Sequence, residues 1–257
     1  MEILVCVKRV PTVGGTMALT EDGQRVDTRM SGFTVSPHEE CAVEEAVRIV
    51  ERLGGSVTVL TLGPPDAADQ VRDMLALGAN HGVVLESDGK EWGPLATAKA
   101  IESSVARRSQ LSSGYDLLLF GNEAADTGDY QVPVRVAHAL GLPCVTGIKH
   151  LQISAEENKL RARREYRGVE EVFELPLPAV VSVKEGINLP RYPSLPGRLR
   201  AKRAALERLS PAWHAEGVRT LGLRLPEGRQ HRAQVLGTGV DAVPALVSLL
   251  DELGVLS

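Results

Sequence analysis

Five short apolar runs recur along the first 183 residues, and they constrain the fold more than any other feature. Segments of helical period separate the first four of these runs, and alternation of this kind is typical of a doubly wound sheet. Because the runs are rich in aliphatic and β-branched residues, we interpret them as buried strands. We therefore predict an α/β fold with a mainly parallel, Rossmann-like sheet. The predicted strands are Ile3 to Val7, Val57 to Leu62, Gly82 to Leu85, Leu117 to Phe120 and Ala179 to Val183.

The best-defined helix start lies at Ser36. Ser36 can cap the helix, Pro37 suits its first position and Glu39 completes a capping box. Glu44 and Arg48 are spaced to pair at i,i+4, on a different face from the apolar stripe. Further helices are expected near Asp66 to Leu77, Pro94 to Arg107 and Asp129 to Gly141.

Beyond Cys144 the pattern changes, and we predict an antiparallel hairpin inserted near residues 147–176. The segment 188–197 contains three prolines, which exclude regular structure across it. A basic amphipathic stretch from Leu199 to Leu209 follows, and a short helix is expected near Ala242 to Leu253. The predicted organisation is therefore an α/β domain over 1–186, a loop and basic helix over 187–205, and a C-terminal arm over 206–257.

Composition and charge exclude several classes of protein. With 33 acidic and 29 basic residues the net charge is −4, so no overall field would draw the chain onto nucleic acid or an anionic membrane. Cys6, Cys41 and Cys144 form no CxxC or zinc-ligand spacing. The N-terminus enters a strand-like run at once, and no apolar run reaches transmembrane length. We expect a cytoplasmic protein that does not insert into membranes.

A polar loop of small residues follows the fourth predicted strand and runs into a helix. In open α/β sheets, ligands bind at the carboxyl ends of strands where the winding reverses, and a helix N-terminus there attracts phosphate. We predict that a nucleotide phosphate binds here; alternatively, Asp126 or Asp129 simply caps the helix. The loop comprises Gly121, Asn122, Glu123, Ala124, Ala125, Asp126, Thr127, Gly128, Asp129, Tyr130, Gln131 and Val132.

The residues after the first strand face the same crevice. Cys6 could contact a base through its main chain while Lys8 and Arg9 supply charge; a buried thiol followed by solvated basic residues is the simpler reading. The sequence has no GxGxxG, Walker A, HExxH or GxSxG motif, and its histidines are scattered. A nucleotide site with no evident base, nucleophile or metal suggests a protein that holds a cofactor rather than an enzyme with its own turnover.

Several separated motifs, in the same order along the chain, resemble those of electron-transfer flavoprotein beta subunits, and the resemblance covers about residues 1–205. The hairpin over 164–170 before Leu177 to Val181 matches the family's signature region. The other matching segments are Val7 to Val10, Pro37 with Ala42 to Val47, Asp126 to Val132 and Leu189 to Pro196.

The resemblance implies an adenine nucleotide alpha hydrolase-like core in a heterodimer. An alpha subunit would hold most of one FAD, and the beta subunit would bind a non-catalytic AMP. Glu165 would lie at the subunit interface. Electrons would come from acyl-CoA or other flavin dehydrogenases and leave to a quinone oxidoreductase. In this chain the AMP site would be formed by Cys6, Ser36, Pro37, His38, Glu39, Leu62 and the loop from Gly121 to Val132.

The same resemblance implies that a recognition loop docks on dehydrogenases, with Leu195 as an apolar anchor. Its residues would be Arg191, Tyr192, Pro193, Ser194, Leu195 and Pro196. Two alternatives remain open. In a bifurcating homologue a second FAD would replace AMP, and a stand-alone adenine-nucleotide sensor would need no flavin partner.

Overall fold

The structure is a computed structural model that describes residues 1–12, 17–89, 92–215, 220–225 and 235–256. The chain forms two compact units. One consists of Met1–Ala18 with Asp27–Leu221, and the other of Leu19–Val26 with Gly222–Ser257. The candidate site lies in the larger unit.

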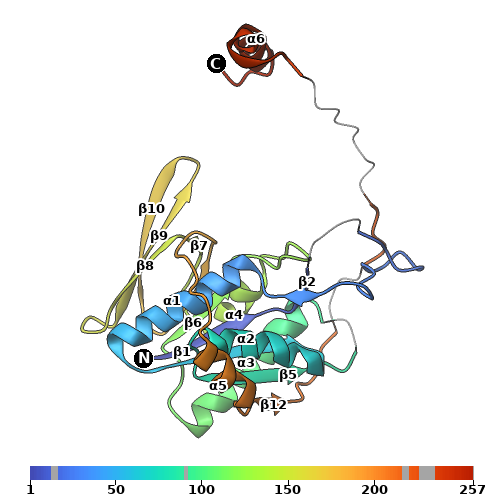
Figure 1. Ribbon diagram of the computed structural model, residues 1–257. Coiled ribbons are helices and arrows are strands. Elements are labelled where there is room, and N and C mark those ends of the chain that lie inside the picture. Colours follow the sequence, from blue (N-terminus) through green and yellow to red (C-terminus); the bar gives the residue numbers. More distant parts are fainter. Residues whose placement is uncertain (13–16, 90–91, 216–219, 226–234, 257) are drawn as a thin grey trace. The chain divides into compact units, whose positions relative to one another are not determined.

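A seven-stranded parallel sheet forms the centre of the larger unit, in the order β12-β5-β4-β1-β6-β11-β7. Its strands β12, β5, β1, β6 and β7 are labelled in Figure 1. All five predicted strands belong to this sheet, so the predicted α/β fold is confirmed. The two edge strands, β7 and β12, were not predicted from the sequence. The strands are β1 (Glu2–Val7), β4 (Ser56–Gly63), β5 (His81–Glu86), β6 (Leu117–Gly121), β7 (Cys144–Ile148), β11 (Ala179–Val183) and β12 (Glu207–Leu209).

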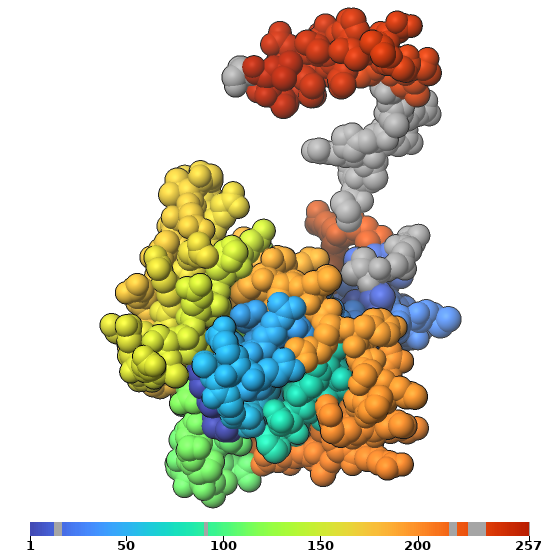
Figure 2. Space-filling model, turned by 60° about the vertical axis from the view of Figure 1, so that its left-hand side comes forward, coloured from blue at the N-terminus to red at the C-terminus, as the bar shows by residue number. Residues whose placement is uncertain are grey.

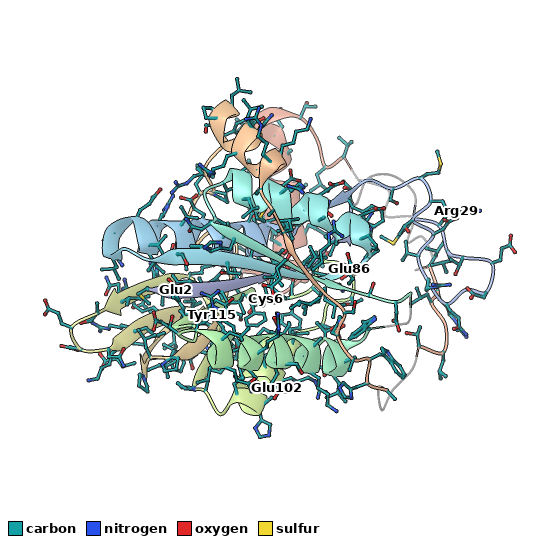
Figure 3. All side chains as sticks on the ribbon, turned by 90° about the horizontal axis from the view of Figure 1, so that it is seen from below. Glu2, Cys6, Arg29, Glu86, Glu102 and Tyr115 are labelled. Carbon is teal, nitrogen blue, oxygen red and sulfur yellow. The ribbon has the colours of Figure 1, made fainter. Side chains whose placement is uncertain are left out.

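Helices cover both faces of this sheet. The side chains of β1 alternate between the two faces of the sheet. Ile3 and Val5 pack in the core against α1 and α2, whereas Leu4 and Cys6 pack in the core against α3 and α4. Figure 3 shows these layers edge-on, with Cys6 in the middle of the molecule. The helices are α1 (Pro37–Leu53), α2 (Ala68–Ala76, after the 3₁₀ turn η1, Pro65–Ala67), α3 (Pro94–Leu111) and α4 (Val132–Leu140).

The antiparallel insertion is a three-stranded sheet, β8 (His150–Ser154), β9 (Lys159–Tyr166) and β10 (Val169–Pro176). The predicted hairpin is confirmed for β9 and β10, whose tight turn places Arg167 and Gly168 at positive φ. The predicted start of this insertion near residue 147 was wrong, because residues up to Ile148 belong to β7, which pairs in parallel with β11.

Two helix starts also differ from the prediction. Helix α4 begins at Val132 rather than near Asp129. Helix α5 (Leu195–Arg203) begins inside the proline-containing segment that we expected to be irregular. Pro196 is tolerated because a proline in the first helical turn loses no intrahelical hydrogen bond. The basic stretch expected from Leu199 to Leu209 is therefore the end of α5 followed by β12.

Two short strands, β2 (Val10–Pro11) and β3 (Phe33–Thr34), pair within the connection between β1 and α1. In the smaller unit, the 3₁₀ turn η2 (Gly239–Ala242) leads into α6 (Val243–Glu252), which confirms the predicted C-terminal helix. The described part of α6 buries no residue. Residues 216–219, 226–234 and 257 of the predicted arm lie outside the described residues. Among the described helices, none has the length and apolar character needed to cross a membrane.

Candidate functional site

The predicted site lies where the winding of the sheet reverses. From β1 the chain passes through α1 to β4 on one side, and later returns to place β6 on the other side of β1. The connections after β1 and β6 therefore diverge at their carboxyl ends, which is where open α/β sheets bind ligands. An ion pair of 2.6 Å between Lys8 Nζ and Asp126 Oδ1 joins the two connections.

The first turn of α1 forms one wall of this crevice. Ser36 and Glu39 make the predicted capping box. The buried Glu39 carboxylate also accepts a hydrogen bond from the Lys8 backbone N–H (2.9 Å), in addition to that from the Ser36 N–H (3.1 Å). Burial raises the pKa of Glu39 to about 8, although these hydrogen bonds oppose the shift. A single carboxyl thus fixes the loop after β1 against the start of α1.

Gly121 lets the end of β6 approach this helix closely. A Cβ at this position would lie 2.7 Å from Glu39 Cγ and 3.3 Å from His38 Cβ, so any larger side chain would force the wall apart. His38 is itself held, because its Nδ1 accepts a 2.7 Å hydrogen bond from the Glu185 N–H. Its Nε2 lies 3.6 Å from a Glu123 carboxylate oxygen.

Asn122 connects β6 to the neighbouring strands. Its N–H donates to the Val183 carbonyl (3.0 Å), and its Oδ1 accepts from the Ser182 hydroxyl (3.4 Å). The Gly147 N–H donates to the same hydroxyl (3.1 Å), which extends the network into β7. Ser182 and Gly147 were not predicted as site residues, although a serine inside the apolar run of β11 was a signal that could have identified Ser182.

The loop between β6 and α4 provides backbone donors at a helix N-terminus. Gln131 is the N-cap, and no side chain in the described structure caps α4, so the expectation that Asp126 or Asp129 caps it was wrong. Pro133, in the first turn, has no N–H. The N–H groups of Val132 and Val134, in the same turn, have no intrahelical acceptor, because a helix provides none for its first turn. These donors and the nearby Lys8 ammonium fit a phosphate.

The loop itself is tightly folded. The Ala124 N–H donates to the Asp129 carbonyl (3.1 Å), the Gly128 N–H donates to the Ala124 carbonyl (2.7 Å), and Gly128 has a φ of +67° that favours glycine. Ala125 and Thr127 lie within this turn, and Tyr130 is exposed. The loop therefore keeps its shape through its own backbone.

Cys6 and Leu62 lie near the carboxyl ends of the adjacent strands β1 and β4. Burial, with a smaller contribution from Glu39, raises the pKa of the Cys6 thiol, so it stays neutral. Of the two basic residues that follow, Lys8 is solvated as expected, with a side chain 41% exposed, although its ammonium pairs with Asp126. Arg9 is half-buried, and its guanidinium lies 3.2 Å from the centre of the Phe33 ring.

The segment predicted to dock on dehydrogenases, which we call the recognition segment (residues 188–194 with the first turn of α5), lies along α1 (Figure 2). Tyr192 and Leu195 are exposed, at 87% and 72%. Ser194 caps α5 by accepting from the Gly197 N–H (3.1 Å). Arg191, in contrast, is engaged with α1. Its Nε donates to Glu44 Oε2 at 2.8 Å.

The expected Glu44–Arg48 pair is present, at 2.5 Å. Glu44 is nevertheless buried, at 2% exposed, whereas the Arg48 side chain is 48% exposed. Burial alone would raise the pKa of Glu44, but hydrogen bonds from Arg191 and Arg48 outweigh it and lower the pKa.

Comparison with known proteins identifies the family. The model of the electron transfer flavoprotein domain matches residues 26–213. The chain belongs to the electron transfer flavoprotein beta subunit family. It is 33% identical to the electron transfer flavoprotein subunit beta of Bacillus subtilis over 85% of this chain and 86% of the relative. The corresponding subunits of Bradyrhizobium diazoefficiens and Homo sapiens are 32% and 31% identical over 98–100% of both chains.

Membership of the electron transfer flavoprotein family confirms the resemblance and gives the chain a role in electron transport within a flavoprotein. Such subunits are electron carriers rather than catalysts.

Glu165, predicted at the subunit interface, lies exposed on β9 and lines a cavity of about 270 Å³. The other lining residues are Gly147, Lys149, Arg167 and Lys184.

Proposed function

We propose that this chain is the beta subunit of a heterodimeric electron transfer flavoprotein, binding AMP in the crevice between β1 and β6 and helping an alpha subunit hold FAD. The observation that carries the proposal is the uncapped N-terminus of α4 at the point where the sheet reverses its winding. The flavin supplies one-electron chemistry when bound. The residues of this chain supply position and electrostatic environment.

The contacts at the crevice suit a bound, unreacting nucleotide. Lys8 is paired with Asp126, His38 accepts from a backbone N–H, and Glu39 accepts from two. Titratable groups engaged in this way hold the walls in place rather than shuttle protons. In our proposal the AMP contacts come from Cys6, Leu62, Ser36 to Glu39 and Gly121 to Val132.

The recognition segment is proposed to dock on acyl-CoA or other flavin dehydrogenases, and electrons would leave to a quinone-linked oxidoreductase. An exposed leucine at the start of a fixed helix loses little entropy on binding. In the same scheme residues 1–186 bind the nucleotide, 187–205 recognise partners, and 206–257 pack on the alpha subunit. The exposed apolar side chains of α6, Val243, Leu246 and Val247, support that last assignment.

Co-expression with a candidate alpha subunit tests the proposal. We expect a yellow heterodimer in which Leu195→Ala slows electron transfer from a reduced dehydrogenase while FAD and AMP content stay unchanged. Leu111→Ala is the matched control, because Leu111 is equally exposed (73%) at the C-terminal end of α3.

Each alternative gives a different result. A colourless monomer that binds ATP would indicate a nucleotide sensor, and a second FAD in place of AMP would indicate a bifurcating homologue. Loss of flavin from Leu195→Ala would mean that the segment is structural.

A further inference from the structure

A buried carboxylate that plays no part in the crevice lies beneath the recognition segment. Glu44, 2% exposed on the central turns of α1, accepts hydrogen bonds from the Arg191 backbone N–H (3.1 Å) and from Arg191 Nε (2.8 Å). The Arg191 guanidinium also donates to Glu51 at 2.6 and 3.0 Å. One arginine therefore bridges two carboxylates of the same helix.

Arg48 and Asn188 extend this attachment. Arg48 donates to Glu44 Oε1 (2.5 Å) and to the Leu189 carbonyl (3.0 Å). The Asn188 side-chain amide donates to the Cys41 carbonyl (3.0 Å) and to a Glu45 carboxylate oxygen (2.9 Å). The Leu189 carbonyl and the Arg191 N–H are thus hydrogen-bonded to side chains of α1. These hydrogen bonds restrain the backbone of the segment as well as its side chains.

The far end of the segment is fixed through α5 and α2. A Cβ at Gly197 would lie 2.7 Å from the Ala76 carbonyl oxygen, so α5 packs closely on α2. Arg72 donates to the carbonyl oxygens of Ala201 (2.7 Å) and Ala204 (3.0 Å) at the C-terminal end of α5. The exposed Tyr192 and Leu195 lie between these two attachments.

We propose that Glu44 is a positioning residue for docking: by binding Arg191 and Arg48 it holds the recognition segment in the conformation that presents Tyr192 and Leu195 to a dehydrogenase. This inference rests on the proposed docking function. Because the recognition segment is ordered before the encounter, its backbone loses little conformational entropy when the complex forms. This smaller entropy loss strengthens association without any added contact. Glu44 uses both carboxylate oxygens, Oε1 for Arg48 and Oε2 for Arg191. A glutamine at this position keeps one acceptor oxygen, but it loses the negative charge and presents an NH₂ donor in place of the other oxygen.

The test uses the flavin-loaded heterodimer and an acyl-CoA dehydrogenase reduced by its substrate. We expect Glu44→Gln to raise the KM for the heterodimer about tenfold while kcat and FAD content stay unchanged. Amide hydrogen exchange over residues 185–194 should become faster. Glu40→Gln is the matched control, because it removes the same charge from the same helix and Glu40 has no hydrogen bond or ion pair with residues 188–194 in the described structure. Arg191→Lys should raise KM less than Arg191→Gln, because the lysine keeps one charged donor.

The outcomes separate this inference from the function on which it rests. If Leu195→Ala raises KM and Glu44→Gln behaves like Glu40→Gln, docking stands and the positioning role is overturned. If Glu44→Gln loses FAD or fails to form the heterodimer, its role is structural and the inference is also overturned. If Leu195→Ala leaves KM unchanged, the docking function itself fails, and the positioning role fails with it.

Discussion

Glu39 and Glu44 are both buried on α1, little more than one turn apart, yet their pKa values shift in opposite directions. Glu39 has two backbone N–H groups as close partners, and burial raises its pKa to about 8. Glu44 has two guanidinium groups as partners, and they lower its pKa despite burial. Burial acts to raise both pKa values, and only at Glu44 do the hydrogen bonds from charged donors outweigh it.

The two glutamates also organise different parts of the molecule. Glu39 joins the loop after β1 to the helix start and shapes the crevice, whereas Glu44 holds a segment 147 residues away along the chain. Helix α1 thus connects the proposed nucleotide site to the proposed docking surface. If the two halves of this helix differ as the contacts indicate, substitutions of Glu39 and Glu44 should have different effects.

The largest effect is expected at Glu44. Glu44→Ala leaves Arg191 and Arg48 without their shared carboxylate. A broken buried pair costs about 3–5 kcal/mol, and because both arginines reach solvent we expect a loss of about 3 kcal/mol in the free energy of unfolding, at the low end of this range. Denaturant unfolding measures it, with Glu40→Ala as the comparison on the same helix. A loss no greater than that of Glu40→Ala would contradict the account of the buried pair.

A slightly smaller effect is expected at Gly121. Its Cβ would lie 2.7 Å from Glu39 Cγ, so Gly121→Ala should cost about 1–3 kcal/mol by overpacking and reduce the AMP retained on purification. Gly222→Ala is the control, because the nearest atom to its Cβ would be the Gly23 carbonyl oxygen at 3.8 Å. Unchanged stability and AMP content in Gly121→Ala would mean that the crevice wall is not tightly built.

The pH dependence of stability should distinguish Glu39 from Glu44. Because the folded-state pKa of Glu39 is raised from 4.5 to about 8, the folded protein holds a proton that the unfolded chain has released in this interval. The contribution to stability is greatest below pH 4.5 and is lost as pH rises through 8. Relative to Glu39→Gln, the wild type should lose about 1 kcal/mol per pH unit between pH 6 and 8. A difference between the two proteins that stays constant over this range would show that Glu39 is already ionised.

The smallest effect is expected at Lys8. Its ion pair with Asp126 is partly exposed, so Lys8→Gln should change the free energy of unfolding by less than about 1 kcal/mol. AMP affinity should fall more clearly, because the ammonium lies beside the proposed phosphate site. Thermal unfolding and equilibrium AMP binding measure the two effects. A large loss of stability without any loss of AMP affinity would assign Lys8 to the fold instead of the site.

Local sequence signals predicted some of these features well. The capping box at Ser36 and the buried strands depend on neighbouring residues, and both appear as expected. The start of α4 was wrong because Asp129 has the chemistry of a cap, while the turn closed by Gly128 delays the helix to Val132. The burial of Glu44 could not be predicted from spacing, because its decisive partner, Arg191, is distant in the sequence.

Identification of the nucleotide released from the purified heterodimer tests the central claim most directly. The account predicts AMP equimolar with FAD after denaturation, separated by chromatography and identified by mass, and less AMP from the Gly121→Ala protein. A fully flavin-loaded heterodimer that releases FAD and no other adenine nucleotide would contradict it.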